Sequence, residues 1–160
     1  MHITNLILHS AVATSMAVNN AVDAATALGI FVVVGAANDG KDASTKLPAS
    51  AATAFTVGAI GIDNIRPTWS NFGPLVDIFA PGVEIISTGW KGQPLRSSET
   101  SMSTPHISGL ALYLKAIEGR ALDSPTAIGN RIRELATKGV VVDPGTGSPN
   151  LLAYNGNGRR

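Results

Sequence analysis

A serine stands where the sequence predicts the start of a helix. Ser101 lies within residues 100–106, and the apolar residues that follow recur at three- and four-residue spacing. The N-terminus of a helix offers free N–H groups and positive partial charge, which stabilise a developing oxyanion. A hydroxyl there can act as a nucleophile, but Ser and Thr are also the usual helix caps. The spacing alone favours the cap.

Two other polar residues invite the same question. His106 follows Ser101 by five residues, which on a helix separates them by roughly 7 Å along the axis. That separation exceeds one helical turn. Asn38 stands in the tripeptide Asn-Asp-Gly, which by itself indicates a turn.

The elements that would position these residues alternate between strands and helices. Apolar runs predict strands at residues 3–8, 30–34, 55–60, 76–80 and 83–86. Helical spacing predicts helices from Ser15 to Gly29, from Ser103 or Thr104 to Gly119, and from Ser124-Pro125 to Lys138-Gly139. Residues 87–100 are predicted to be a polar loop and the tail to be irregular. Continuous apolar strands between helices predict an α/β fold with a parallel sheet.

Composition limits the class of protein. The 160 residues suffice for one domain, and 44% of them are hydrophobic, so the chain can fill a core. The net charge of +1 gives no electrostatic footprint for nucleic acid or an anionic membrane. No apolar run reaches the ~18 residues of a membrane span. The absence of cysteine excludes disulfides, thiolate metal sites and thiol catalysis.

The first residues do not read as a secretory signal. Residues 1–13 contain no Lys or Arg, and polar residues interrupt the apolar run at Asn5, His9 and Ser10. A signal peptide needs a basic start and an unbroken apolar centre. We therefore predict a strand there.

Residues 100–109, Thr-Ser-Met-Ser-Thr-Pro-His-Ile-Ser-Gly, resemble the nucleophile motif of the subtilisin-like serine proteases, nearest to the fungal, proteinase K-like branch. Further segments resemble the same family in the same order: residues 31–38, 55–59, 69–73, 76–82 and 149–154. The resemblance implies a parallel sheet with helices on both faces. It implies that residues 17–155 form the C-terminal part of a peptidase domain, with residues 1–16 poorly matched and residues 156–160 a tail. The N-terminal strands of the family fold would then be missing.

The resemblance also implies roles and a substrate. Ser101 would attack the scissile carbonyl of a polypeptide, and the Asn38 side chain would stabilise the oxyanion together with the Ser101 N–H. His106 would be structural. The wall that receives a substrate side chain would be formed by Gly35, Ala36 and Ala37. Family members are usually secreted or vacuolar.

A calcium site is implied in the same way. Its ligands would be the carboxylate of Asp77 and the main-chain carbonyls of Ala52 and Ala54. Oxygen ligands suit Ca²⁺, although three protein residues leave most of the coordination shell to water. A polar residue between two short strands explains Asp77 equally well.

The chain departs from the family pattern in three respects. A serine nucleophile needs a base and an orienting carboxylate, and the family's Asp-Thr-Gly-like and His-Gly-Thr-like segments do not occur in residues 1–160. Glu99 stands where the family has Gly, which brings a negative charge near a developing oxyanion. Ala37 also replaces a Gly, which narrows the wall of the substrate site.

Two functions remain open at this stage. The chain is either an incomplete serine endopeptidase or a pseudo-protease remnant that binds without catalysis. No partner is implied unless a missing N-terminal half is supplied. We expect the 160-residue chain by itself not to react with a fluorophosphonate probe, and we expect its exposed sheet edge to make it marginally stable.

Overall fold

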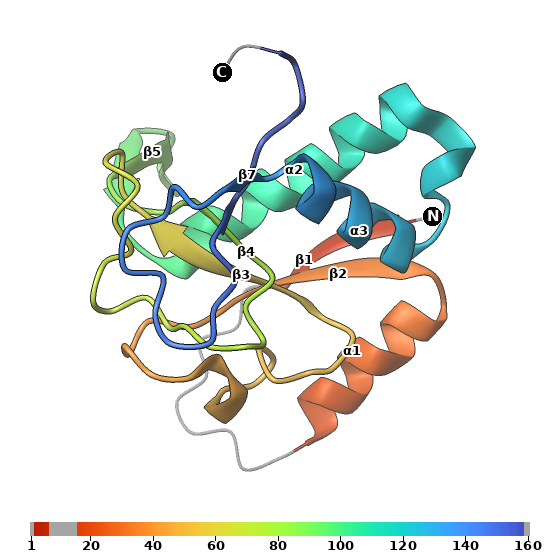
Figure 1. The fold of residues 1–160 in the computed structure, drawn as a ribbon, viewed down its shortest axis with the longest axis horizontal. Coiled ribbons are helices and arrows are strands. Elements are labelled where there is room, and N and C mark those ends of the chain that lie inside the picture. Colours follow the sequence, from red (N-terminus) through yellow and green to blue (C-terminus); the bar gives the residue numbers. More distant parts are fainter. Residues whose placement is uncertain (1, 7–15, 159–160) are drawn as a thin grey trace.

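The structure is a computed structural model that describes residues 2–6 and 16–158. Its centre is a six-stranded sheet in the order β1-β2-β3-β4-β8-β7 (Figure 1). The strands β1 to β4 and β8 are parallel and β7 is antiparallel to β8. Their bounds are His2–Leu6 (β1), Ile30–Gly35 (β2), Phe55–Ile60 (β3), Ile78–Pro81 (β4), Thr137–Lys138 (β7) and Leu151–Leu152 (β8).

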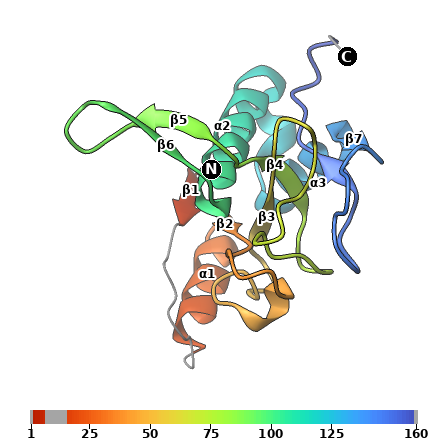
Figure 2. The ribbon, with the colours of Figure 1, turned by 90° about the vertical axis from the view of Figure 1, so that its left-hand side faces the viewer.

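Helices cover both faces of this sheet, as predicted (Figure 2). On one face, Val32 and Val34 of β2 pack against Val22 of helix α1 (Ala17–Ala27). On the other face, Phe31 and Val33 pack with the buried residues of α2 (Thr100–Glu118) and α3 (Pro125–Leu135). Successive side chains of a strand point to opposite faces, so the continuous apolar run of β2 is buried between two layers. Two 3₁₀ turns, Ala43–Thr45 and Gly119–Leu122, complete the helical elements.

The predicted start of α2 is wrong by about one turn. The helix begins at Thr100 and not at residue 103 or 104, so Pro105 lies inside it. Pro105 removes the N–H that would bond to the Ser101 carbonyl, but the first N–H of the helix is satisfied by a side chain 62 residues away, that of Asn38. This long-range bond, which local sequence does not reveal, extends the helix. Its predicted end at Gly119 is confirmed.

The predicted ends of α1 and α3 are confirmed in part. Gly29 follows α1 with a φ of 84°, as expected of a residue that ends a helix. Ser124 caps α3 by accepting a hydrogen bond from the Ala127 N–H at 3.1 Å. The prediction that α3 reaches residues 138–139 is wrong, because residues 137–138 pair with β8. The predicted cap Ser15 and residues 7–8 of the first strand lie outside the described residues.

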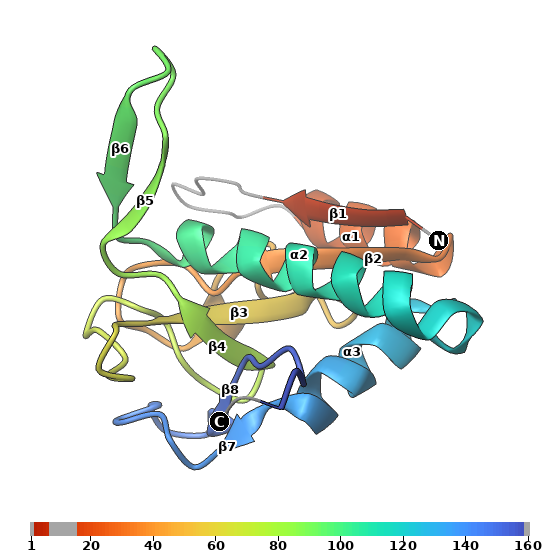
Figure 3. The ribbon, with the colours of Figure 1, turned by 90° about the horizontal axis from the view of Figure 1, so that it is seen from above.

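The strands late in the chain also differ from expectation. The predicted strands at 76–80 and 83–86 are shifted to 78–81 and 85–88. The strand β5 (Ile85–Thr88) forms an antiparallel hairpin with β6 (Pro94–Ser97), in a segment expected to be a loop. Figure 3 shows this hairpin projecting from the body of the molecule. Its residues are largely exposed, so they lack the apolar pattern that predicts a strand. The tail expected to be irregular contributes β8.

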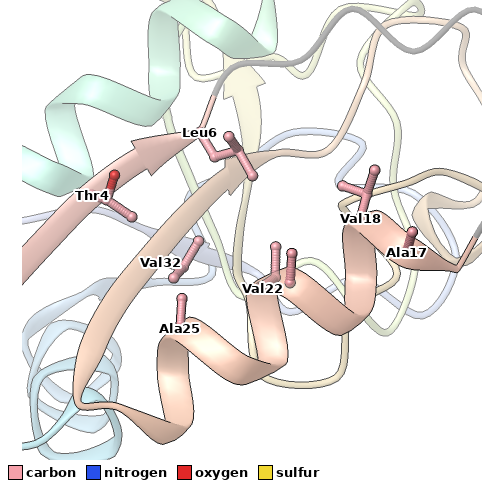
Figure 4. A pocket seen from close by; sticks show the side chains of 8 residues that line it. Thr4, Leu6, Ala17, Val18, Val22, Ala25 and Val32 are labelled. Atoms are coloured by element: carbon pink, nitrogen blue, oxygen red, sulfur yellow. The ribbon is translucent and has the colours of Figure 1, made fainter.

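An apolar groove lies at the edge of the sheet. It has a volume of about 450 Å³ and lies between β1 and α1. Leu6, Val18, Val22 and Val32 are among its lining side chains (Figure 4). None of its lining residues comes from the Ser101 segment. In the described part of the chain, no helix is long and apolar enough to cross a membrane.

Candidate active site

The first turn of α2 is fixed to the carboxyl ends of two sheet strands. The Thr100 N–H donates to Oδ1 of Asn38, just beyond β2, at 2.8 Å. The Ser103 hydroxyl donates to the carbonyl of Ala80 in β4 at 3.0 Å. Ser101 lies between these two anchors. Open α/β sheets commonly bind ligands at the carboxyl ends of their strands.

Two glycines allow the helix to approach the strands this closely. A Cβ on Gly35 would lie 2.9 Å from Oγ1 of Thr100. A Cβ on Gly82 would lie 2.7 Å from Cβ of Ala59 and would clash with the Ser103 hydroxyl. Gly35 is one of the three residues predicted to form the substrate wall, and here it also determines where the helix can begin.

The amide of Asn38 has one possible orientation. A backbone N–H needs an acceptor, so the oxygen Oδ1 must face Thr100 N and the Nδ2 group must point the other way. The Ser101 N–H belongs to the first helical turn, whose N–H groups have no carbonyl partner within the helix. The first turn of α2 therefore has two hydrogen-bond donors close to it, Asn38 Nδ2 and the Ser101 N–H. Asn38 is exposed. Such a pair can stabilise an oxyanion.

A residue without a predicted role holds the Asn38 loop in shape. Oδ1 of Asn71 accepts hydrogen bonds from the N–H groups of Asp39 at 3.1 Å and Lys41 at 3.0 Å. The backbone N–H of Asn71 donates to the Ala37 carbonyl at 3.0 Å, and its side chain is fully buried. Asn71 therefore fixes the shape of the loop that carries Asn38. The sequence did contain a signal for Asn71. Residues 69–73 resemble the family, but the resemblance gave Asn71 no role.

The other two residues predicted to form the wall, Ala36 and Ala37, differ in backbone conformation and in burial. Ala37 has a φ of 79°, in the left-handed region that costs a residue with a Cβ about 1–2 kcal/mol. This explains why the family pattern has Gly at this position. Ala36 is wholly buried in the core. Its side chain is therefore not available to a substrate, which leaves Gly35 and Ala37 as the predicted wall residues at the surface of the loop.

The hydroxyl of Ser101 is engaged by a neighbouring carboxylate. It donates a hydrogen bond to Oε2 of Glu99 at 2.6 Å, and Ser101 is 9% exposed. Glu99 has φ −158° and ψ 161°, an extended backbone that any residue adopts. The replacement of Gly by Glu at this position is therefore conformationally neutral, and its consequence lies in the side chain. The proton that a catalytic base would remove is directed at Glu99.

The predicted calcium ligands precede the neighbouring strands β3 and β4, but Asp77 already has partners. Its Oδ2 accepts the Thr56 N–H at 2.7 Å, and Oδ1 lies 3.4 Å from Nη2 of Arg133. Burial raises the pKa of Asp77 to about 6, against the lowering effect of the Thr56 N–H and of Arg133. The Arg133 guanidinium faces the carboxylate oxygen that a calcium ion would need, so these residues do not fit a calcium ion as they stand.

Comparison with known proteins identifies the family. The sequence profile described as "Subtilase family" matches residues 6–158. The chain belongs to the subtilase family. It is 52% identical over 146 residues to Alkaline protease 1 of Aspergillus flavus, a match that covers 89% of this chain and 35% of that protein. It is 51% identical over 146 residues to Subtilisin-like protease 1 of Pseudogymnoascus destructans, covering 90% and 36% of the two chains.

A solved structure supports the same assignment. The crystal structure of a cold adapted subtilisin-like serine proteinase superimposes with a TM-score of 0.87 at 33% identity, covering 96% of this chain and 54% of that one. The predicted subtilisin-like α/β fold is thus confirmed. This subtilase chain spans about a third of the length of the two relatives and about half of the solved chain.

The histidine closest in sequence to Ser101 in this subtilase chain contacts its own helix and not the Ser101 hydroxyl. His106 is exposed, and its Nδ1 lies 2.9 Å from the carbonyl of Met102, one turn back on α2. That contact engages the ring with its own helix, and the structural role of His106 stays a prediction. Among the described residues, the hydroxyl of Ser101 makes its hydrogen bond to Glu99 and not to an imidazole.

Proposed function

We propose that this chain carries the nucleophile and the oxyanion site of a serine endopeptidase. The observation that supports it best is the hydrogen bond from Thr100 N to Asn38 Oδ1, which holds the Asn38 amide beside the helix turn that carries Ser101 and leaves its Nδ2 group to donate to another acceptor. The base and its orienting carboxylate would come from the part of the protein that corresponds to the uncovered length of the relatives. The bounds of the peptidase part, residues 17–155, remain a prediction.

The reaction follows from these groups. The Ser101 oxygen attacks the carbonyl carbon of a peptide bond while its proton passes to the base. The Asn38 Nδ2 group and the Ser101 N–H donate to the resulting oxyanion. The C–N bond then breaks, the amine leaves with the proton, and a water molecule hydrolyses the acyl-enzyme by the reverse sequence. The polypeptide substrate would lie against Gly35 and Ala37.

A second function, that of a pseudo-protease that binds without catalysis, is favoured by one contact. The Ser101 hydroxyl already donates to Glu99. A nucleophile whose proton is held by a carboxylate is less available to a base and therefore less reactive.

The family resemblance also implies a location. We propose that the intact protein is secreted or vacuolar.

The two functions are separated by labelling with a fluorophosphonate probe. The 160-residue chain by itself should not be labelled. The same chain fused in frame to the upstream part of Alkaline protease 1 should be labelled at Ser101 and should hydrolyse peptide amides, and Ser101→Ala should abolish both. A fusion protein that unfolds cooperatively yet neither labels nor hydrolyses would support the pseudo-protease.

A further inference from the structure

The side chain of Arg133 lies between the Phe55 ring, Gly129 and Asp77, and we call this position the slot. Its Cζ lies 5.2 Å from the centre of the Phe55 ring, and its Nη2 lies 3.4 Å from Oδ1 of Asp77. Guanidinium groups stack on aromatic faces while they pair with carboxylates. Arg133 projects from α3, and Phe55 begins β3, so the slot joins the helix layer to the sheet.

Glycine at position 129 makes room for this guanidinium. Gly129 lies one turn before Arg133 on α3, and a Cβ there would lie 3.2 Å from both Nη1 of Arg133 and Cδ2 of Phe55. That spacing is tighter than ordinary van der Waals contact. Nη1 is buried and has no hydrogen-bond partner within the described residues. The guanidinium is therefore held in the slot by packing and by Asp77.

We propose that Arg133 supplies the positive charge at Asp77 that a calcium ion would supply, so that this site does not depend on calcium. Asp77 presents a single carboxylate, one oxygen of which accepts the Thr56 N–H and the other of which faces the guanidinium. A calcium ion at Asp77 would have to displace the Arg133 guanidinium, and the Asp77 carboxylate would be its only charged ligand among the predicted ones. Ca²⁺ takes six to eight oxygen ligands, and the other predicted ligands, Ala52 and Ala54, carry no charge.

Calcium binding and thermal unfolding of the 160-residue chain at pH 7.5 test this proposal independently of proteolysis. We expect the Tm of the wild-type chain to be the same in millimolar CaCl₂ as in millimolar MgCl₂. In Arg133→Met, which keeps an apolar chain over Phe55 but removes the charge, calcium should bind and should raise the Tm by about 5 °C or more. Arg133→Lys, which keeps the charge, should behave as the wild type.

Two further variants assign the effect to this site. The double variant Arg133→Met with Asp77→Asn should lose the calcium response. Arg131→Met is the matched control, because Arg131 lies on the same helix and pairs with Glu118 and Glu134 instead. It should show no calcium response.

The proposal is overturned if calcium raises the Tm of the wild-type chain by several degrees and Asp77→Asn abolishes the rise. It is also overturned if Arg133→Met folds but binds no calcium. If Arg133→Met does not fold, the comparison of the wild type with Asp77→Asn still decides, because a calcium-dependent site at Asp77 must respond in the wild type.

Discussion

Replacing Glu99 should accelerate the proposed protease. The Ser101 hydroxyl cannot donate its proton to Glu99 and to a base at once, so the base must compete with the hydrogen bond seen at 2.6 Å. That distance falls in the range of charge-assisted O–H···O⁻ bonds, about 2.5–2.7 Å. Removing the carboxylate frees the hydroxyl and also removes a negative charge near the oxyanion.

The size of the gain follows from the strength of this bond. Hydrogen bonds to charged groups contribute about 1.5–3 kcal/mol net, and the half-buried position of Glu99 places this one at the lower end. A difference of about 1.4 kcal/mol corresponds to a factor of ten in rate. We therefore expect Glu99→Gly to raise kcat/KM roughly tenfold.

The assay uses the fusion protein that contains the upstream motifs. Its kcat/KM on a peptide amide and its rate of fluorophosphonate labelling at Ser101 should rise together. Glu99→Ala, which also lacks the carboxylate but keeps a Cβ, should match Glu99→Gly because the backbone at this position is extended. Glu99→Gln keeps an acceptor without the charge and should give a smaller gain.

Two results would refute the reasoning. If Glu99→Gly, Glu99→Ala and Glu99→Gln all lower the labelling rate while the protein stays folded, the carboxylate assists Ser101 instead of restraining it. Equal rates in all four proteins would show that the base displaces Glu99 at no measurable cost.

Three more predictions concern the oxyanion donor, the wall and the buried carboxylate. Asn38→Ala in the fusion protein should lower kcat by about a hundred- to a thousandfold, the range for removing such a donor from subtilisin; Asn38→Asp, which keeps the acceptor for Thr100 N, should lose as much if donation is what matters. Ala37→Gly should relieve the positive φ and raise the Tm by about 2 °C, after allowance for the flexibility of glycine in the unfolded chain; Ala36→Gly, one residue away and buried, should lower it. Because the pKa of Asp77 is about 6 in the folded chain against an ordinary 3.8, the folded state binds this proton more tightly, so stability should fall as pH rises from about 4 to 6. The loss from this residue is about 3 kcal/mol, and urea unfolding across that range should show it for the wild type and not for Asp77→Asn.

The sequence predicted the features that depend on local pattern. The buried strand at residues 30–34, the cap Ser124 and the terminating residues Gly29 and Gly119 appear where periodicity and turn chemistry place them. The motif at residues 100–109 also led to the family. These features are encoded within a few residues of one another, so a single sequence suffices to find them.

Contacts between distant residues were beyond local pattern. The start of α2 depends on the side chain of Asn38, 62 residues earlier. The turn that carries Asn38 depends on Asn71, about 30 residues later. The partner of Asp77 is Arg133, on a helix whose role in that site no motif indicated. Each contact joins residues that are distant in sequence and that the folded sheet brings together.

The two departures that affect function share one physical property. Glu99 and Arg133 each place a charged side chain where another group would otherwise act, a base at Ser101 and a cation at Asp77. The fold holds each charge beside its partner, so the other group must displace it and not merely bind. Removing the tethered charge should therefore strengthen both interactions, through faster acylation in one case and through calcium binding in the other. Because Glu99 lies at the start of α2 and Arg133 on α3, and the two contacts share no residue, the two substitutions should act independently in a double variant.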